Sequence, residues 1–201
     1  MGLRPWKGSS RRTFLPGQEW FYIKVYLNES VSDQFLRAVL SPLVKQVQKK
    51  GWATDTFFIR YADPNYHLRI RFLTSPKQYG RLVDAWQKAL QVYTEAGLVE
   101  RAQLDTYQRE LERYHPELID HCEAIFSADS QCLLSWLVHS EPANEEDRYA
   151  LAVLSVDELL SDFALTLPQK LRISQQLQQV FFNEHGGKKE LKQKLNDHYR
   201  K

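Results

Sequence analysis

The sequence has few cysteines and none of the motifs that mark metal sites. Cys122 and Cys132 are its two cysteines, and neither belongs to a CxxC motif; HExxH is also absent. Both fall in a segment that we expect to be helical, where their spacing separates them by about 15 Å, too far for a disulfide. The sequence therefore predicts two reduced cysteines, no metal site and no cofactor.

Long apolar runs and a strong net charge are lacking as well. No stretch of about 18 apolar residues occurs, and no apolar segment follows the basic N-terminal residues, so we expect a cytoplasmic protein without membrane contact. The 27 Lys and Arg residues against 25 Asp and Glu residues give a net charge of +2. This balance does not favour direct nucleic-acid binding, and any basic site must be local.

The chain is nevertheless rich enough in apolar residues to form a core. It is 43% hydrophobic, and the pattern of its first half alternates between strand and helix signals. The expected strands are 19–27, 55–62, 67–72 and 98–104; the helices begin at Ser32 and at Ser75-Pro76, and Gly51 and Gly97 end them. This β-α-β-β-α-β order predicts a ferredoxin-like sheet layer.

The second half of the chain reads as helical. Breaks at Pro142, Pro168 and Gly186-Gly187 divide it into four expected helices, 117–139, 143–165, 169–184 and 188–200. The fold class is thus α+β, a ferredoxin-like sheet layer followed by a helical C-terminal part. We expect residues 1–18 to form a flexible leader and 19–201 a single domain, with a sheet part (19–115) and a helical part (116–201).

One strand carries a row of cationic residues. In HLRIRF, Leu68, Ile70 and Phe72 alternate with His67, Arg69 and Arg71, so the second set shares the face away from the core. Spacing alone is typical of a solvated outer face. Two arginines about 6.6 Å apart along a strand can also hold one carboxylate or phosphate. Both interpretations stay open on this pattern.

A second polar cluster occurs in DTYQRELERYH, residues 105–115. Glu110 and Arg113 are three residues apart and face the same way on a helical turn, as an ordinary exposed ion pair would. The functional alternative is that Glu110 orients Arg113 or a proton in a shared site, with the hydroxyl groups of Tyr107 and Tyr114 nearby.

Four blocks together resemble a known family. FLPGQEWFYIKVYL, FFIRYADPNYHLRIRF, DTYQRELERYH and EAIFSADS follow the order and approximate spacing of the C-terminal elimination domain of lantibiotic dehydratases, which also occurs as stand-alone thiopeptide-type bacteriocin biosynthesis proteins. The resemblance covers about residues 13–135. It departs at RYHP, where the family has RYGG, and no SxxHM-like histidine motif occurs up to Lys201.

The resemblance implies a chemistry and partners. A separate glutamylating dehydratase subunit would esterify a Ser or Thr of a precursor peptide, and this domain would expel glutamate to leave a dehydroamino acid. It implies that Arg69, Arg71 and Arg113 bind glutamate, and that Glu110 orients an arginine or moves a proton. His67, Tyr107 and Tyr114 would help to bind substrate.

Three alternatives to this function stay open. They are a [4+2] cycloaddition on a dehydrated thiopeptide precursor, a non-catalytic subunit that binds the precursor or a partner, and a ferredoxin-like domain of unrelated role. The sequence leaves the oligomeric state undetermined.

Overall fold

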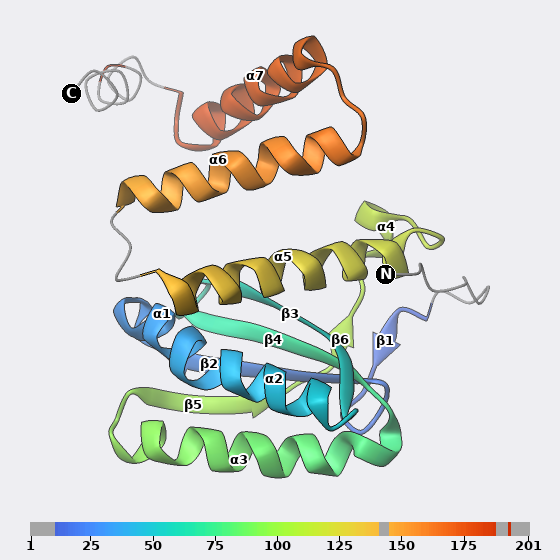
Figure 1. The fold of residues 1–201 in the computed structure, drawn as a ribbon, viewed down its shortest axis with the longest axis vertical. Coiled ribbons are helices and arrows are strands. Elements are labelled where there is room, and N and C mark those ends of the chain that lie inside the picture. Colours follow the sequence, from blue (N-terminus) through green and yellow to red (C-terminus); the bar gives the residue numbers. More distant parts are fainter. Residues whose placement is uncertain (1–10, 141–144, 188–192, 194–201) are drawn as a thin grey trace. The chain divides into compact units, whose positions relative to one another are not determined.

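The structure, a computed structural model, describes residues 11–140, 145–187 and 193. Its contacts divide the chain into two compact units, Met1–Glu141 and Pro142–Lys201 (Figure 1). The sequence placed the change from sheet part to helical part after residue 115, whereas the helix that follows packs with the sheet.

The first unit contains a four-stranded sheet in which all neighbouring strands are antiparallel. The order is β3-β4-β2-β5, the ferredoxin-like arrangement that the sequence predicted. The strands are β2 (Trp20–Leu27), β3 (Ala53–Tyr61), β4 (His67–Thr74) and β5 (Val99–Leu104).

Two helical connections join these strands. The first is one continuous path with a π-helical middle, and Gly51 ends it with a φ of 65° that favours glycine. Its parts are η1 (Glu29–Val31), α1 (Ser32–Phe35), η2 (Leu36–Leu40) and α2 (Ser41–Lys49). The second connection is η3 (Pro76–Gln78) followed by α3 (Tyr79–Glu95).

The two faces of the sheet differ in what they bury. One face packs on α1, α2 and α3 and forms the main core, because alternate residues of each strand are apolar. Its fully buried strand residues include Phe21, Val25, Leu68, Ile70 and Phe72. The opposite face holds a smaller aromatic cluster of Phe14, Trp20, Tyr22, Phe57 and Tyr107.

Helix α5 (Ile119–His139) runs alongside β3, the edge strand of the sheet (Figure 1). The hydroxyl oxygen of Ser127 accepts a hydrogen bond from the amide of Thr56, and that of Ser130 from the amide of Phe58, each at 3.2 Å. These bonds satisfy backbone groups that an edge strand otherwise leaves unpaired. They are one reason why α5 belongs to the sheet unit.

Part of the expected flexible leader is ordered. Strand β1 (Thr13–Phe14) pairs with β6 (Tyr107–Gln108), and the buried ring of Phe14 stacks on that of Tyr107. The prediction of a flexible segment is therefore wrong for these residues, because the apolar Phe14 completes an aromatic cluster. Residues 1–10 lie outside the described part of the chain.

A short turn links β6 to α5. It contains α4 (Leu111–Tyr114) and then His115, whose φ of 60° and ψ of 137° fall in a region favoured by glycine. The RYHP departure thus places a histidine in a backbone conformation that a glycine would adopt with less strain.

The second unit contains helices α6 (Glu145–Asp162) and α7 (Leu167–Glu184). Thr166 and Gln169 form a capping box at the start of α7, and Lys170 of α7 bonds Asp157 of α6 at 2.7 Å. The expected helix 188–200 falls outside the described residues except at Gln193. Within the described residues, no helix is long and apolar enough to cross a bilayer.

Candidate anion-binding site

Arg71 lies in a cage of aromatic rings on the sheet face opposite the main core. Its guanidinium carbon is 4.5 Å from the ring centre of Tyr22, 4.8 Å from that of Tyr107 and 5.1 Å from that of Phe57. Strand register explains two of these three contacts, because Tyr22 on β2 and Phe57 on β3 are the direct cross-strand partners of Arg71. Aromatic faces attract a cation, so the cage holds the guanidinium in place.

Among the residues that the structure describes, no carboxylate forms an ion pair with the buried Arg71. The residue is 7% exposed, and its Nε and Nη1 atoms are buried and form no hydrogen bond with the described residues. Burial lowers the pKa of Arg71, although an arginine keeps its charge at physiological pH. Buried guanidinium groups are normally paired with an anion, because desolvation of an unpaired charge is costly. An anion in contact with these N–H groups, which are buried in this structure, would offset that cost.

Arg69 is fixed by His67, two positions before it on β4. The Arg69 Nε donates to His67 Nε2 at 3.0 Å, so that nitrogen carries no proton. The other ring nitrogen, Nδ1, then donates to the carbonyl oxygen of Asn65 at 2.8 Å. His67 is 1% exposed, and burial lowers its pKa, which favours this neutral form. His67 thus holds Arg69 through a hydrogen bond that a protonated ring could not accept.

A lysine and an aspartate extend the same face beside Arg69. Lys24 is the partner of Arg69 in the β2–β4 register, and its ammonium lies 2.5 Å from a carboxylate oxygen of Asp105. Burial by itself would raise the pKa of Asp105, but Lys24 and the amide of Thr106 lower it. We call the surface formed by Lys24, His67, Arg69 and Arg71 the cationic face.

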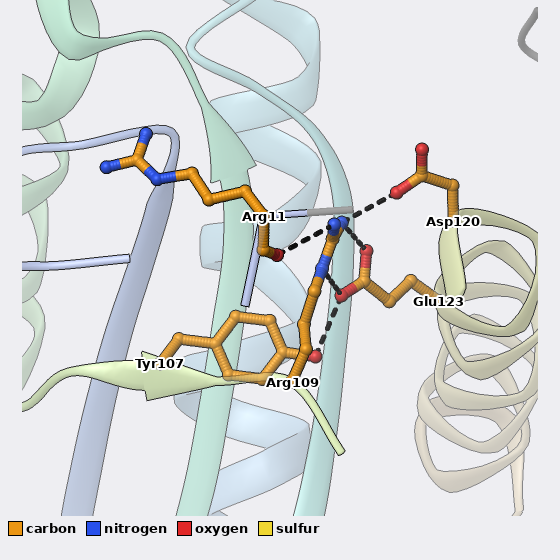
Figure 2. A network of polar contacts seen from close by, with 5 residues as sticks. All are labelled: Arg11, Tyr107, Arg109, Asp120 and Glu123. Carbon is orange, nitrogen blue, oxygen red and sulfur yellow. Dashed lines mark hydrogen bonds and ion pairs between the residues drawn. The ribbon is translucent and has the colours of Figure 1, made fainter. Parts of the chain in front are cut away.

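A buried polar network joins Tyr107 and Arg109 to Glu123 and Asp120 of helix α5 (Figure 2). Glu123 of α5 is 4% exposed and accepts hydrogen bonds from the Tyr107 hydroxyl at 2.8 Å and from Nε and Nη2 of Arg109 at 2.8 and 2.6 Å. Arg109 also reaches Asp120 at 2.7 Å. Burial raises the pKa of Tyr107, so its hydroxyl stays a donor. The network ties β6 to α5 and keeps the Tyr107 ring over Arg71.

The structure brings some of the predicted site residues together. Arg71 and Tyr107 are in direct contact, and His67 and Arg69 share the same face. Glu110 and Arg113 instead form an ion pair of 3.2 Å, with side chains 63% and 69% exposed, as the simpler interpretation of their spacing suggested. No hydrogen bond or ion pair joins them to Arg69 or Arg71 in the described part of the chain. Tyr114 packs edge-on against Phe126 of α5.

Several residues of this site were not predicted from the sequence. Tyr22 and Phe57 carry a signal that could have found them, because strand alternation places both aromatic rings on the polar face of the sheet. Glu123 and Arg109 carry no such signal. They come from different elements, and only the packing of α5 brings the two charges together.

A family model described as lantibiotic biosynthesis dehydratase C-term matches residues 20–201. The chain belongs to this family. The family resemblance proposed from four sequence blocks is therefore confirmed, and the chain is related to the dehydratases of lantibiotic biosynthesis.

Sequence similarity to individual relatives supports this assignment. The chain is 26% identical over 164 residues to subtilin biosynthesis protein SpaB of Bacillus subtilis, and 30% identical over 139 residues to nisin biosynthesis protein NisB of Lactococcus lactis subsp. lactis. These alignments cover 81% and 68% of the chain. Among solved structures, the tRNA dependent lantibiotic dehydratase MibB from Microbispora sp. 107891 matches 60% of the chain with a TM-score of 0.56 and 31% identity.

The matched region is a small part of each relative. It corresponds to 16% of SpaB, 13% of NisB and 12% of the MibB chain. The chain thus spans less than a fifth of the length of each of these relatives.

Proposed function

We propose that this protein eliminates glutamate from a glutamylated Ser or Thr of a precursor peptide and thereby forms a dehydroamino acid. The observation that carries this proposal is Arg71, a buried guanidinium inside an aromatic cage, two of whose N–H groups have no partner among the described residues. Glutamate is an anion of the class that such a site accepts, and a planar guanidinium matches the two oxygens of a carboxylate.

The elimination breaks two bonds and forms one double bond. A base removes the Cα proton of the modified residue, a Cα–Cβ double bond forms, and the Cβ–O bond breaks so that glutamate leaves as a carboxylate. Negative charge therefore grows on the departing oxygens. Arg71 stabilises that charge in a site with little competing water, and loss of such a donor typically costs about 3–4 kcal/mol in the transition state.

The other assigned residues have supporting roles in this proposal. Arg69, held by His67, supplies a second guanidinium on the cationic face. We keep Arg113 as a residue that binds glutamate, and Glu110 as the residue that orients an arginine or moves a proton, as the resemblance implies. Their exposed ion pair leaves both side chains accessible to a peptide.

The proposal implies two partners. One is the precursor peptide. The other is a separate glutamylating subunit, because the glutamyl group must be attached before it can be expelled; the solved relative MibB is described as tRNA dependent.

Binding of the precursor without chemistry is the second candidate, and one observation favours it. Among the described residues, His67 is the histidine that contacts the arginine row, and both of its ring nitrogens are already engaged. His67 therefore does not provide a free acid or base beside Arg71. The cycloaddition alternative stays a prediction without an observation of its own.

Mass spectrometry of a peptide with one O-glutamyl serine tests the proposal. Elimination gives a product lighter than the unmodified peptide by one water, whereas hydrolysis restores the unmodified mass. We expect elimination by the wild type, loss of about 100-fold in rate for Arg71→Ala, and no change for Arg81→Ala, an exposed arginine on α3. Unchanged glutamyl peptide that binds in an Arg71-dependent way would establish the binding alternative instead.

A further inference from the structure

The two edge strands of the sheet differ in whether another element covers them. The β3 edge is covered by α5, whose Ser127 and Ser130 accept hydrogen bonds from the outward amides of Thr56 and Phe58. The opposite edge is β5, where every residue from Glu100 to Leu104 is exposed. Within the described residues, no other strand pairs with β5 on that side. Uncovered edges of this kind are templates for another extended chain.

The hydrogen-bond pattern shows which groups of β5 face outward. The amide of Asp105 donates to the carbonyl oxygen of Tyr22 at 3.1 Å, so this pair is a hydrogen-bonded pair of the antiparallel ladder. Such pairs alternate, and therefore Gln103, opposite Lys24, also bonds toward β2. The backbone groups of Ala102 and Leu104 consequently point away from the sheet.

This open edge is continuous with the cationic face. Arg101 and Gln103 pair with Tyr26 and Lys24, so their side chains lie on the face of Arg69 and Arg71. The Arg71 guanidinium lies between Tyr22 on β2 and Phe57 on β3, so a strand added to β5 would lie three strand spacings, or about 14 Å, from it. Lys24 on β2, the nearest member of the cationic face, would lie about two spacings, or about 10 Å, away. An extended O-glutamyl serine side chain spans a length of about 10 Å and would place its carboxylate beside Lys24, at the border of the cationic face.

We propose that the β5 edge binds the precursor peptide as an added antiparallel or parallel strand, through the backbone groups of Ala102 and Leu104. This inference rests on the proposed function for the identity of the peptide. Backbone pairing accepts most sequences, since main-chain groups supply the hydrogen bonds. Alternate side chains of the bound strand then lie on the same face of the sheet as Arg101, Gln103 and Lys24.

Amide hydrogen exchange of the full chain tests this surface with a ten-residue peptide that contains one unmodified serine. In the free protein, the amides of Ala102 and Leu104 should exchange quickly and those of Gln103 and Asp105 slowly. Saturating peptide should slow Ala102 and Leu104 at least tenfold and leave the inward amides unchanged. The inward amides are a built-in control for general stabilisation.

Modified peptides and one pair of variants complete the test. N-methylation of alternate peptide residues on the edge that faces β5 should weaken binding about fivefold for each lost hydrogen bond, and methylation of the offset residues should not. Ala102→Pro removes one outward amide, as edge strands tolerate, and should raise the KM for the glutamylated peptide without lowering kcat; Ala102→Val keeps the amide and should not.

The outcomes separate this inference from the proposed function. Elimination of glutamate without peptide-dependent protection of Ala102 and Leu104 overturns the β5 inference and leaves the function standing. Protection of the Ala102 and Leu104 amides that occurs without peptide and increases with protein concentration also overturns it, because a second copy of the chain then occupies the edge. Peptide-dependent protection without elimination supports the β5 surface and contradicts the catalytic proposal.

Discussion

The ring of Tyr107 lies 4.8 Å from the guanidinium carbon of Arg71, while its hydroxyl donates to Glu123 at 2.8 Å. One residue thus joins the candidate site to helix α5. The ring covers the cation, and the hydroxyl fixes the ring. These two roles can be separated by substitution.

Tyr107→Phe keeps the ring but removes the donor to Glu123. We expect a loss of about 1 kcal/mol in the free energy of unfolding and elimination within about threefold of the wild type, because the cage around Arg71 persists. Tyr107→Leu removes the ring and should lower the elimination rate further at similar stability. Urea unfolding and the peptide assay measure the two effects. Equal activity of both variants would show that the ring has no role at Arg71.

Glu123→Ala should be the most destabilising single change in this network. It leaves the buried Arg109 with Asp120 as its remaining carboxylate partner, and removal of one member of a buried ion pair typically costs about 3–5 kcal/mol. Glu117→Ala, a nearby exposed glutamate, is the control and should lie within about 0.5 kcal/mol of the wild type. Similar unfolding midpoints for the two variants would contradict a structural role for Glu123.

The fold could be predicted from the sequence to a larger extent than the site. Strand and helix periodicity depends on local spacing, so β2, β4, β5 and the ferredoxin-like order followed from the pattern. The formation of strand β1 could not be predicted from this pattern, because it depends on a contact between Phe14 and Tyr107, which lie far apart in sequence. Arg69 and Arg71 were found through alternation and resemblance, whereas Glu123 needed the packing of α5.

Arg71→Met should make the protein more stable and less active. Methionine fills the aromatic cage without an unpaired charge, and replacement of buried charged groups by apolar side chains of similar volume is often stabilising. We expect a gain of about 1–2 kcal/mol in urea unfolding together with loss of elimination, the trade-off typical of functional sites. A loss of more than about 1 kcal/mol would indicate that the cage stabilises the cation fully on its own.

The pKa of His67 predicts a pH dependence of stability. Burial, the largest cause, lowers this pKa in the folded state, so the unfolded state binds a proton first as the pH falls below the ordinary value of 6.5. The associated stability is complete above pH 6.5 and falls toward the lowered pKa, by at most about 1.4 kcal/mol per pH unit.

His67→Gln isolates this effect, because its amide oxygen can accept from Arg69 but does not titrate. The difference in unfolding free energy between wild type and His67→Gln should change below pH 6.5 and stay constant above it. The cations that face His67 are Arg69, Lys24 and Arg101, and each lowers the pKa of His67 further. A difference that is independent of pH would contradict the neutral state of His67.

The serines of α5 should contribute measurably to the covered edge of the sheet. Ser127→Ala and Ser130→Ala each leave one buried or partly buried amide of β3 without its acceptor, which should cost about 1–2 kcal/mol. Ser135 is an exposed serine on the same helix, so Ser135→Ala is the control for helix propensity. Faster exchange of the Thr56 amide in Ser127→Ala, and of the Phe58 amide in Ser130→Ala, should accompany the loss. Unchanged exchange would show that these hydrogen bonds are not needed.

The central claim is that Arg71 holds the carboxylate of glutamate, and a titration of its Nε resonance by ¹⁵N NMR tests it most directly. The Arg71 signal is assigned by its disappearance in Arg71→Lys, and Arg81 is the internal control. We predict that added glutamate shifts the Arg71 resonance to saturation and leaves that of Arg81 unchanged. An unshifted Arg71 resonance at glutamate concentrations that inhibit elimination would contradict the account.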